Sequence, residues 1–221
     1  MKSLAVLLAG SAIALASNAT VISGGSFSNA LQTTEISQTG SLGLFDSTLG
    51  TLTSFKLTFS GDVSTLITLT NRASGAETVR GVTSVDLSVG SGIGSLNSII
   101  TNPVVSLTGS TGFQSLAAGA SVTFGPLTQS NSSDLSSSLA GVLADLQQVG
   151  GGNFNLNCTS FSGFALTGGG GNVNASQTTQ ARCGAAIEYT YTERTTQVPE
   201  PGALALAGIA LAGLALVRRK A

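Results

Sequence analysis

The sequence predicts an all-β protein: an antiparallel β-sandwich with one short amphipathic helix, flanked by an N-terminal signal peptide and a C-terminal transmembrane sorting helix. Apolar and polar residues alternate across residues 49–59, as in a strand with one buried face. Other short Thr- and Val-rich stretches are separated by Gly, Ser and Asn, which favour turns. No regular succession of strands and long helices suggests a parallel sheet, so two packed antiparallel sheets are expected.

Residues 1–19 have the features of a secretory signal peptide. Lys2 supplies a positive start, an apolar run covers 4–16, and Ser17-Asn18-Ala19 places small residues where signal peptidase cleaves. We expect cleavage after Ala19, with a competing site three residues earlier. The apolar run is too short for a comfortable transmembrane helix, so we interpret it as an export signal.

Residues 45–53, Phe-Asp-Ser-Thr-Leu-Gly-Thr-Leu-Thr, open the first clear strand. This segment resembles the Phe-Asp-x-x-Leu-Gly-Thr-Leu stretch of the choice-of-anchor E domains, bacterial surface modules that occur with different C-terminal anchors. Residues 170–172 and 189–192 are weaker matches. The resemblance implies an extracellular β-rich module over residues 30–195 and brings no catalytic residues. Locally, Phe45 should lie in the core and Asp46 should bond to the backbone two residues on, with a calcium-ligand role as its alternative.

Strand patterns recur along the domain that we expect at 20–197. The apolar positions of the first strand, expected to face the core, are Leu49, Phe55, Leu57 and Phe59. Gly61-Asp62 would mark the turn after it. The other candidate strands cover 66–70, 78–89, 104–107, 122–124, 154–158 and 183–192. Glycine clusters at 90–94 and 168–171 are interpreted as turns, because neither has the pattern of a phosphate-binding loop.

One stretch has helical spacing instead. Its apolar residues are Leu135, Leu139, Val142, Leu143 and Leu146. Ser133 or Asp134 would cap the start of this helix, and the glycines at 150–152 would end it. We expect a short amphipathic helix that covers an edge or end of the sandwich. A helix that binds a partner is the alternative interpretation.

The two cysteines are expected to form a disulfide. Cys158 shares the apolar parity of Phe154 and Leu156, and Cys183 shares that of Ile187, so both can point inward. Export brings them into an oxidising compartment. In the chain-entropy description, a bridge closing this interval stabilises the fold by roughly 3 kcal/mol.

The C-terminal residues have the layout of a sorting signal. Val198-Pro199-Glu200-Pro201 precedes an apolar run at 202–217, and Arg218-Arg219-Lys220 follows it. As a helix, this run would span roughly 24 Å, less than the ~30 Å hydrocarbon core of a membrane. The three cations would stay on the cytoplasmic side and leave the domain outside. An ordinary, uncleaved tail anchor is the alternative.

This layout resembles the PEP-CTERM signal of Gram-negative bacteria, in which Pro-Glu-Pro precedes a membrane span and a basic cluster. The matching positions are Pro199, Glu200 and Pro201. The resemblance implies processing by an exosortase after an inner-membrane intermediate, followed by display or release outside. The mature protein would then lack residues 202–221.

Composition narrows the function. Charged residues make up 9% of the chain, far below the usual ~25%. The few basic residues within 20–197 are scattered, so we expect no nucleic-acid binding. The chain contains no His, which removes Ser-His-Asp and Cys-His catalysis and imidazole metal ligands. The acidic residues lie singly and Trp is absent, which disfavours a glycosidase. We therefore expect no enzyme activity, no cofactor and no metal.

These observations predict a non-enzymatic protein of the cell surface or of the extracellular matrix of a biofilm. Its Ser-, Thr- and Asn-rich faces would lie among exopolysaccharide chains. The alternative is a specific glycan-binding, lectin-like module. Sugar rings usually stack on aromatic side chains. The candidates here are Tyr189, Tyr191 and several Phe, most of them at core positions, so the first interpretation is favoured.

Overall fold

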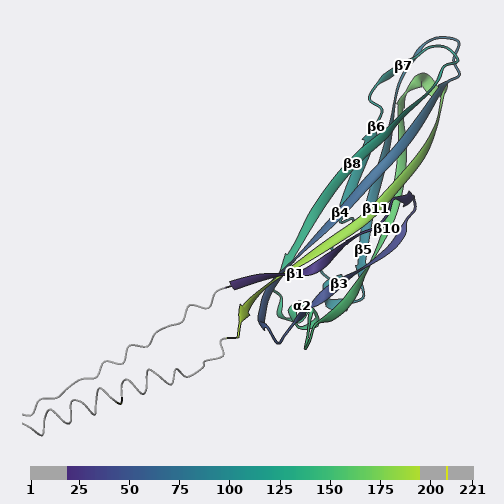
Figure 1. Cartoon of the computed structure of the whole chain (residues 1–221). Helices are drawn as coiled ribbons and strands as arrows, with labels where there is room; N and C mark the ends of the chain where they lie inside the picture. Colours follow the sequence, from purple (N-terminus) through teal and green to yellow (C-terminus); the bar gives the residue numbers. More distant parts are fainter. Residues whose placement is uncertain (1–18, 195–207, 209–221) are drawn as a thin grey trace, which may run out of the picture.

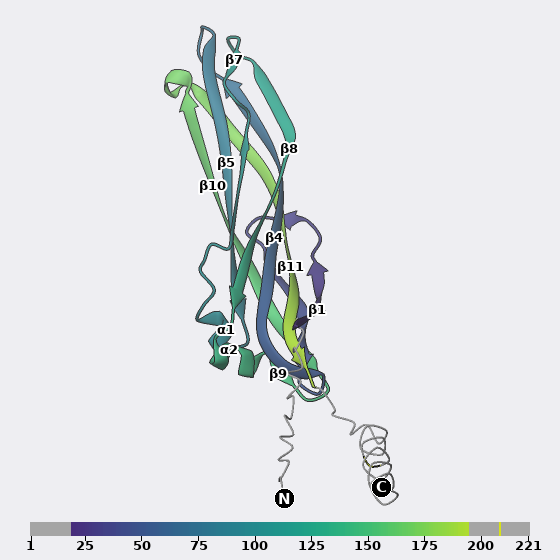
Figure 2. The same cartoon turned by 90° about the vertical axis from the view of Figure 1, so that its left-hand side faces the viewer.

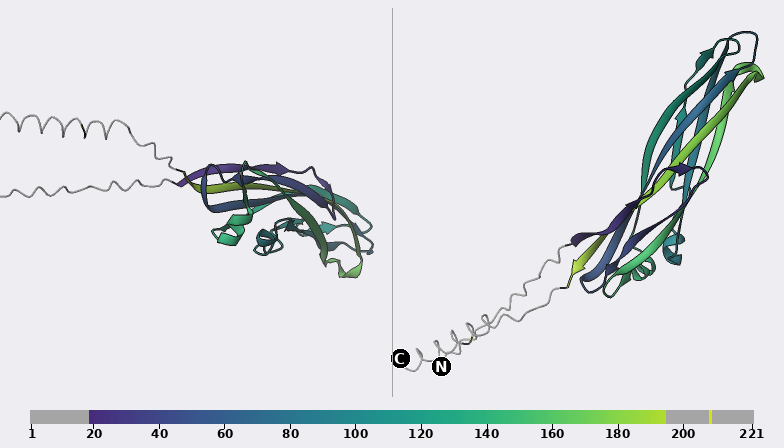
Figure 3. Two further views of the ribbon diagram at one scale, coloured as in Figure 1. Left: turned by 90° about the horizontal axis from the view of Figure 1, so that it is seen from below. Right: turned by 45° about the vertical axis from the view of Figure 1, so that its right-hand side comes forward.

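The computed structural model describes residues 19–194 and Gly208, and it confirms the all-β, antiparallel sandwich (Figure 1). Two sheets pack face to face in a long, narrow body, and Figure 3 shows them as separate layers. The longest strand has 22 residues, which corresponds to roughly 70 Å at ~3.3 Å per residue. Ala19 lies opposite Thr192, so both ends of the described body meet at one pole, the proximal end. We call the opposite pole the distal end.

The first sheet has the strand order β1-β11-β4-β8, with the short β2 also paired to β11. Every pairing in it is antiparallel. Its strands are β1 (Ala19–Ser28), β2 (Gln32–Thr33), β4 (Gly50–Asn71), β8 (Ser121–Ser137) and β11 (Val173–Glu193). The first and last strands of the body are therefore neighbours.

The second sheet has the order β6-β5-β10-β3-β9, with β7 also paired to β5. Only the β3–β9 pairing is parallel among the pairings of residues 19–194. Its strands are β3 (Ser37–Asp46), β5 (Glu77–Ser91), β6 (Val105–Ser110), β7 (Gln114–Leu116), β9 (Gln147–Gln148) and β10 (Gly152–Gly168).

Two clusters of buried apolar side chains fill the space between the sheets. The large proximal cluster includes Phe45, whose ring centroid lies 5.8 Å from that of Tyr189 and 5.1 Å from that of Tyr191. The small distal cluster consists of Ile67, Leu69, Val79, Leu116 and Val173. A buried hydroxyl pair, Thr65 and Thr179 at 2.8 Å, lies between the clusters. We use this pair as the boundary between a proximal half and a distal half.

The expected turn at Gly61-Asp62 is wrong, because both residues lie inside β4. Gly61 faces the core, where a Cβ atom would come within 2.3 Å of Leu87 Cδ1. Asp62 faces outward, accepts a hydrogen bond from the Ser130 hydroxyl and pairs with Arg182 Nε at 2.7 Å. Glycine here supplies space and aspartate supplies a cross-strand contact. The expected strands 49–59 and 66–70 are thus parts of one strand.

The helix expected from Leu135 to Leu146 is shorter and begins later. Leu135 belongs to β8, and α2 covers Ala140–Asp145. The expected caps Ser133 and Asp134 also lie in β8, and the residue before α2, Leu139, makes no side-chain cap. Val142, Leu143 and Leu146 are buried, as the apolar spacing predicted.

A second short helix, α1 (Gly94–Asn97), was not predicted. It begins in the glycine cluster at 90–94, whose first member, Gly90, ends up inside β5. The two helices lie together at the proximal end (Figure 2), where the Ser95 hydroxyl donates to Asp145 Oδ2 at 2.6 Å. The cluster at 168–171 does form a turn, the 3-10 segment η1 (Gly169–Gly171) between β10 and β11.

Candidate functional site

The sorting residues lie outside the described part of the chain. This holds for Val198-Pro199-Glu200-Pro201, for the basic tail Arg218-Arg219-Lys220 and, apart from Gly208, for the span at 202–217. Of the residues around the expected signal cleavage site, those up to residue 18 lie outside the described part of the chain. Ala19 is the first residue of β1 and is exposed. No helix among residues 19–194 combines the length and apolar character needed to cross a membrane.

The disulfide between Cys158 and Cys183 is confirmed. It joins β10 of the second sheet to β11 of the first, with a Cα–Cα distance of 6.4 Å. Both residues are almost completely buried. Gln38 also holds Cys183 in place, because its Oε1 accepts the Cys183 backbone N–H at 3.0 Å. The bridge therefore ties the two sheets together just below the boundary between the halves.

Asp46 performs the local role that the sequence predicts. Its Oδ1 accepts the backbone N–H of Thr48 and that of Gly150, each at 2.9 Å. These bonds, first of all those from Thr48, hold the pKa of Asp46 below its ordinary value. Asp46 thus links the β3–β4 turn to the loop before β10. Within residues 19–194, no three His, Cys, Asp or Glu side chains gather as metal ligands would.

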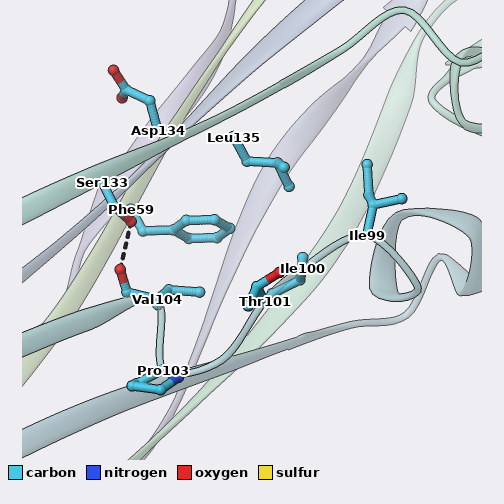
Figure 4. A pocket seen from close by; sticks show the side chains of 9 residues that line it. All are labelled: Phe59, Ile99, Ile100, Thr101, Pro103, Val104, Ser133, Asp134 and Leu135. Carbon is cyan, nitrogen blue, oxygen red and sulfur yellow. Dashed lines mark hydrogen bonds between the residues drawn. The ribbon is translucent and has the colours of Figure 1, made fainter.

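A cleft of about 330 Å³ opens at the β8 edge of the proximal half (Figure 4). Its walls come from β8 and from the loop between α1 and β6. The lining residues are Phe59, Ile99, Ile100, Thr101, Pro103, Val104, Ser133, Asp134 and Leu135. The Ser133 hydroxyl donates to the Val104 carbonyl at 2.5 Å and so closes one side of the cleft.

The interior of this cleft is apolar. In Figure 4 the Asp134 carboxylate points away from Phe59, Leu135 and Ile99. It accepts the Thr58 hydroxyl at 2.7 Å and pairs with Lys56 Nζ at 3.0 Å, and these contacts lower the pKa of Asp134. The cleft therefore offers apolar surface and a few hydroxyl groups, with no acid–base pair directed into it. It can hold a small apolar group.

The outer face of the first sheet is covered mainly by hydroxyl groups. Thr68 pairs with Thr123, and Thr70 with Ser121, each with an oxygen–oxygen distance of 2.8 Å. The outward Ser and Thr residues of this hydroxyl face are Ser60, Ser64, Thr68, Thr70, Ser121, Thr123, Thr128, Ser130, Ser132, Ser176 and Thr178. Such a face matches the polar surface of low charge that the composition predicts, and its charged residues include the pairs Lys56–Asp134 and Arg182–Asp62.

The second sheet and its β6–β7 loop carry exposed aromatic side chains that the sequence interpretation missed. Phe161 is 72% exposed and lies opposite Asp86 in the β10–β5 pairing. Phe113 is also exposed and lies under the guanidinium of Arg80, 5.1 Å from ring centroid to Cζ. Tyr189 and Tyr191 are buried, as expected. The odd-numbered parity of Phe161, opposite to that of Cys158, was the available signal.

Comparison with known proteins gives one informative match. Residues 197–220 match the PEP-CTERM protein-sorting motif. This match supports an exported, exosortase-dependent surface protein that passes through a membrane-anchored sorting intermediate. No curated protein matches the chain.

Solved structures give only distant likenesses. An infectious bursal disease virus structure (Gx strain) matches at 11% identity over 89% of this chain and 48% of that chain, with a TM-score of 0.17. The VP2 subviral particle of the same virus matches at 13% identity over 89% and 49%, with a TM-score of 0.19. The Bacillus thuringiensis toxin parasporin-2 matches at 9% over 80% and 70%, with a TM-score of 0.15. The chain thus spans about half the length of the viral chains, and such low TM-scores carry no argument about function.

Proposed function

We propose that this chain is a non-enzymatic surface or extracellular-matrix protein, cut by an exosortase near Pro199-Glu200-Pro201 and associated with exopolysaccharide. The PEP-CTERM match at residues 197–220 is the observation that carries the proposal. A signal peptide at 1–19, removed after Ala19, starts the route, and the apolar run 202–217 holds the intermediate in the inner membrane.

The described body suits this role. A sandwich tied by the Cys158–Cys183 bridge resists unfolding outside the cell. Its hydroxyl face offers donors and acceptors to the hydroxyl groups of hydrated polysaccharide without a large charge, while both ends of the body lie at the proximal pole. Many weak polar contacts along such a face favour broad association over selective recognition.

Selective glycan binding is the second candidate, and the exposed Phe161 beside Asp86 favours it. An aromatic ring can stack on the apolar face of a sugar, while a neighbouring carboxylate accepts hydrogen bonds from its hydroxyls. A glycan array separates the two functions. Micromolar binding to one glycan class that Phe161→Ala abolishes and Phe113→Ala preserves would establish the lectin function.

The processing step is tested by intact-mass analysis of the exported pool from the native host. We expect a mass that lacks residues 202–221, and we expect replacement of Pro199-Glu200-Pro201 by three alanines to retain the protein in the inner membrane. Replacing Arg194 by Ala, just outside the motif, serves as the control and should leave processing unchanged. Recovery of the exported protein with its tail through Ala221 would contradict the proposal.

A further inference from the structure

The two long sides of the sandwich differ in whether their edge strands are covered by neighbouring segments. On one side, the edge strands β8 and β6 are bridged, because Asn131 Nδ2 donates to the Ser106 carbonyl at 3.1 Å and Ser133 contacts the residue before β6. On the other side, β3 pairs with β10 only as far as Thr159, and β1 pairs with β11 only between Thr192 and Gly184. Within residues 19–194, the distal part of β10 therefore has a neighbour strand, β5, on one edge only.

The open edge of β10 begins after Ser162. The Ser160 backbone N–H still donates to the Ile36 carbonyl, at 3.2 Å. Two residues on, the Glu35 carboxylate accepts both the backbone N–H and the hydroxyl of Ser162, at 2.8 and 2.9 Å. Beyond Ser162, no strand of residues 19–194 pairs with this edge, and none of their side chains donates a hydrogen bond to it or accepts one from it.

Alternation along the strand identifies the groups that are presented there. In an antiparallel sheet, the N–H and C=O of one residue point to the same side, and the next residue points to the other. The backbone N–H groups of Ser160 and Ser162 point to this edge of β10. The backbone N–H and C=O groups of Phe164 and Leu166 therefore point to it as well. Their side chains face the sheet interface but are each 37% exposed, because no strand covers them.

Beyond Ser162 and its contact with Glu35, this edge lacks the features that usually prevent pairing. Natural edge strands are protected by charges, by proline or by a covering segment. No charged residue occurs between Asp145 and Arg182, and 163–168 contain no proline. The segment is therefore an uncharged, apolar template for another extended strand. A second copy of the same segment meets it without like-charge repulsion.

We propose that β10 pairs through this distal edge with β10 of a second copy, antiparallel and about a twofold axis at Ala165. Phe164 then lies opposite Leu166 of the second copy in a hydrogen-bonded pair, and the symmetry repeats this contact. This register places Ser162 opposite Gly168 of the second copy, and because the Ser162 N–H already donates to Glu35, the new hydrogen bonds are confined to Phe164 and Leu166. Because the strands run in opposite directions, the distal halves overlap and the two proximal ends point away from each other. The interaction goes beyond the proposed matrix role and does not depend on polysaccharide.

Cysteine cross-linking tests the register in the protein recovered from the exported fraction of its native host. In a non-hydrogen-bonded antiparallel pair, opposite Cα atoms lie ~4.5 Å apart, within the range of a disulfide. Ala165→Cys should therefore form a covalent dimer on mild oxidation. Thr167→Cys, on the same outward face, is the matched control, because its symmetry mate would lie roughly 13 Å away. The buried Cys158–Cys183 bridge should stay intact in both variants.

The second measurement is the dissociation constant of the dimer, by sedimentation of the same exported protein. Leu166→Pro removes one edge-facing N–H, which an edge strand tolerates, and should weaken association at least about tenfold. Leu166→Val keeps the N–H and should stay close to wild type. A protein that remains monomeric up to about 1 mM, equal cross-linking of the two cysteine variants, or cross-linking of Ala165→Cys to a different exported protein would each overturn the proposal.

Discussion

The proximal and distal halves of this sandwich share five long strands, β4, β5, β8, β10 and β11, yet they are stabilised in different ways. The proximal half contains the large apolar cluster, the aromatic trio of Phe45, Tyr189 and Tyr191, and the disulfide. The distal half contains five buried apolar side chains and a network of polar contacts. The comparison teaches that a long strand can continue past the end of a large core when side-chain hydrogen bonds order the remaining turns.

Asn71 is the centre of the distal polar network. Its Nδ2 donates to the carbonyls of Gly75, Leu116 and Ala117, and its Oδ1 accepts the Ala73 N–H. One buried amide thus orders two loops at the distal pole. The proximal pole uses Asp46 in a comparable way, but there the residue is only partly buried.

The largest expected effect comes from paired truncations in β4. Leu57 and Leu69 lie on the same strand and are both fully buried, one in each cluster. We expect Leu57→Ala to lower the free energy of unfolding by about 3–5 kcal/mol and Leu69→Ala by about 2–3 kcal/mol, because the thin distal cluster can collapse around the smaller side chain. Denaturant unfolding of both variants measures the difference. Equal losses would break the comparison between the halves.

The next effect is that of the disulfide. Replacing Cys158 and Cys183 together by Ala should lower the free energy of unfolding by about 3 kcal/mol. Because the bridge lies next to the boundary, amide hydrogen exchange should accelerate first in the distal parts of β10 and β11. Uniform acceleration along both strands would mean that the halves unfold as one unit.

Loss of the distal network should have a smaller and local effect. Asn71→Ala leaves three loop carbonyls without their donor, at a cost of about 1–3 kcal/mol. Faster hydrogen exchange should be confined to the β4–β5 and β7–β8 loops. Asn157→Ala, at an exposed position of β10, is the matched control and should change neither quantity. Spread of the effect to β3 would argue against an independently ordered distal half.

The smallest effect is expected from pH and falls on the proximal half. The pKa of Asp46 is below its ordinary value of 3.8 because Thr48 and Gly150 donate to it, and that of Asp134 is below 3.8 because of the Thr58 hydroxyl and Lys56. The unfolded chain therefore takes up these protons first as the pH falls. The stabilisation is complete well above pH 3.8 and is lost as the pH drops through the lower folded-state pKa values.

Unfolding free energies measured from about pH 6 down to about pH 2 test this dependence. We expect a decrease only below the ordinary carboxyl pKa. Asp46→Asn should make the decrease shallower, whereas Asp145→Asn, whose carboxylate accepts a hydrogen bond from the Ser95 hydroxyl, provides the comparison. If Asp46→Asn left the acid-dependent decrease unchanged, Asp46 would not contribute to the pH dependence of stability.

Period-two alternation was sufficient to predict parts of β4, β5, β10 and β11, including the inward parity of both cysteines, but it did not reveal β1 or β3. It could not predict strand length, because residues that favour turns also serve other purposes inside a sheet. Gly61 lies in a strand because Leu87 needs the space. Pro126 lies at an irregularity in the pairing of edge strand β8 with β4, where the missing N–H is tolerated.

Some of the candidate sites could be predicted from local sequence patterns, and others depend on how the sheets assemble. Asp46 and the disulfide could be predicted, because each depends on local turn chemistry or on strand parity. Leu49, which extends the same alternation, is exposed, since β4 begins only at Gly50. The cleft at the β8 edge depends on the loop between α1 and β6, and the exposed β10 edge depends on where β3 begins. Neither depends on a sequence pattern, so only the assembled sheets reveal them.

The central position of β11 has a mechanical consequence. This strand is hydrogen-bonded to β4 from Val173 at the distal pole to Glu193 at the proximal pole, and the chain continues from there toward its C-terminal segment. If that segment is held while the distal pole is pulled, the force runs along β11, perpendicular to its hydrogen bonds. The bonds then carry the load together instead of opening one after another. The strand that leads to the C-terminal segment is thus the one placed to withstand tension.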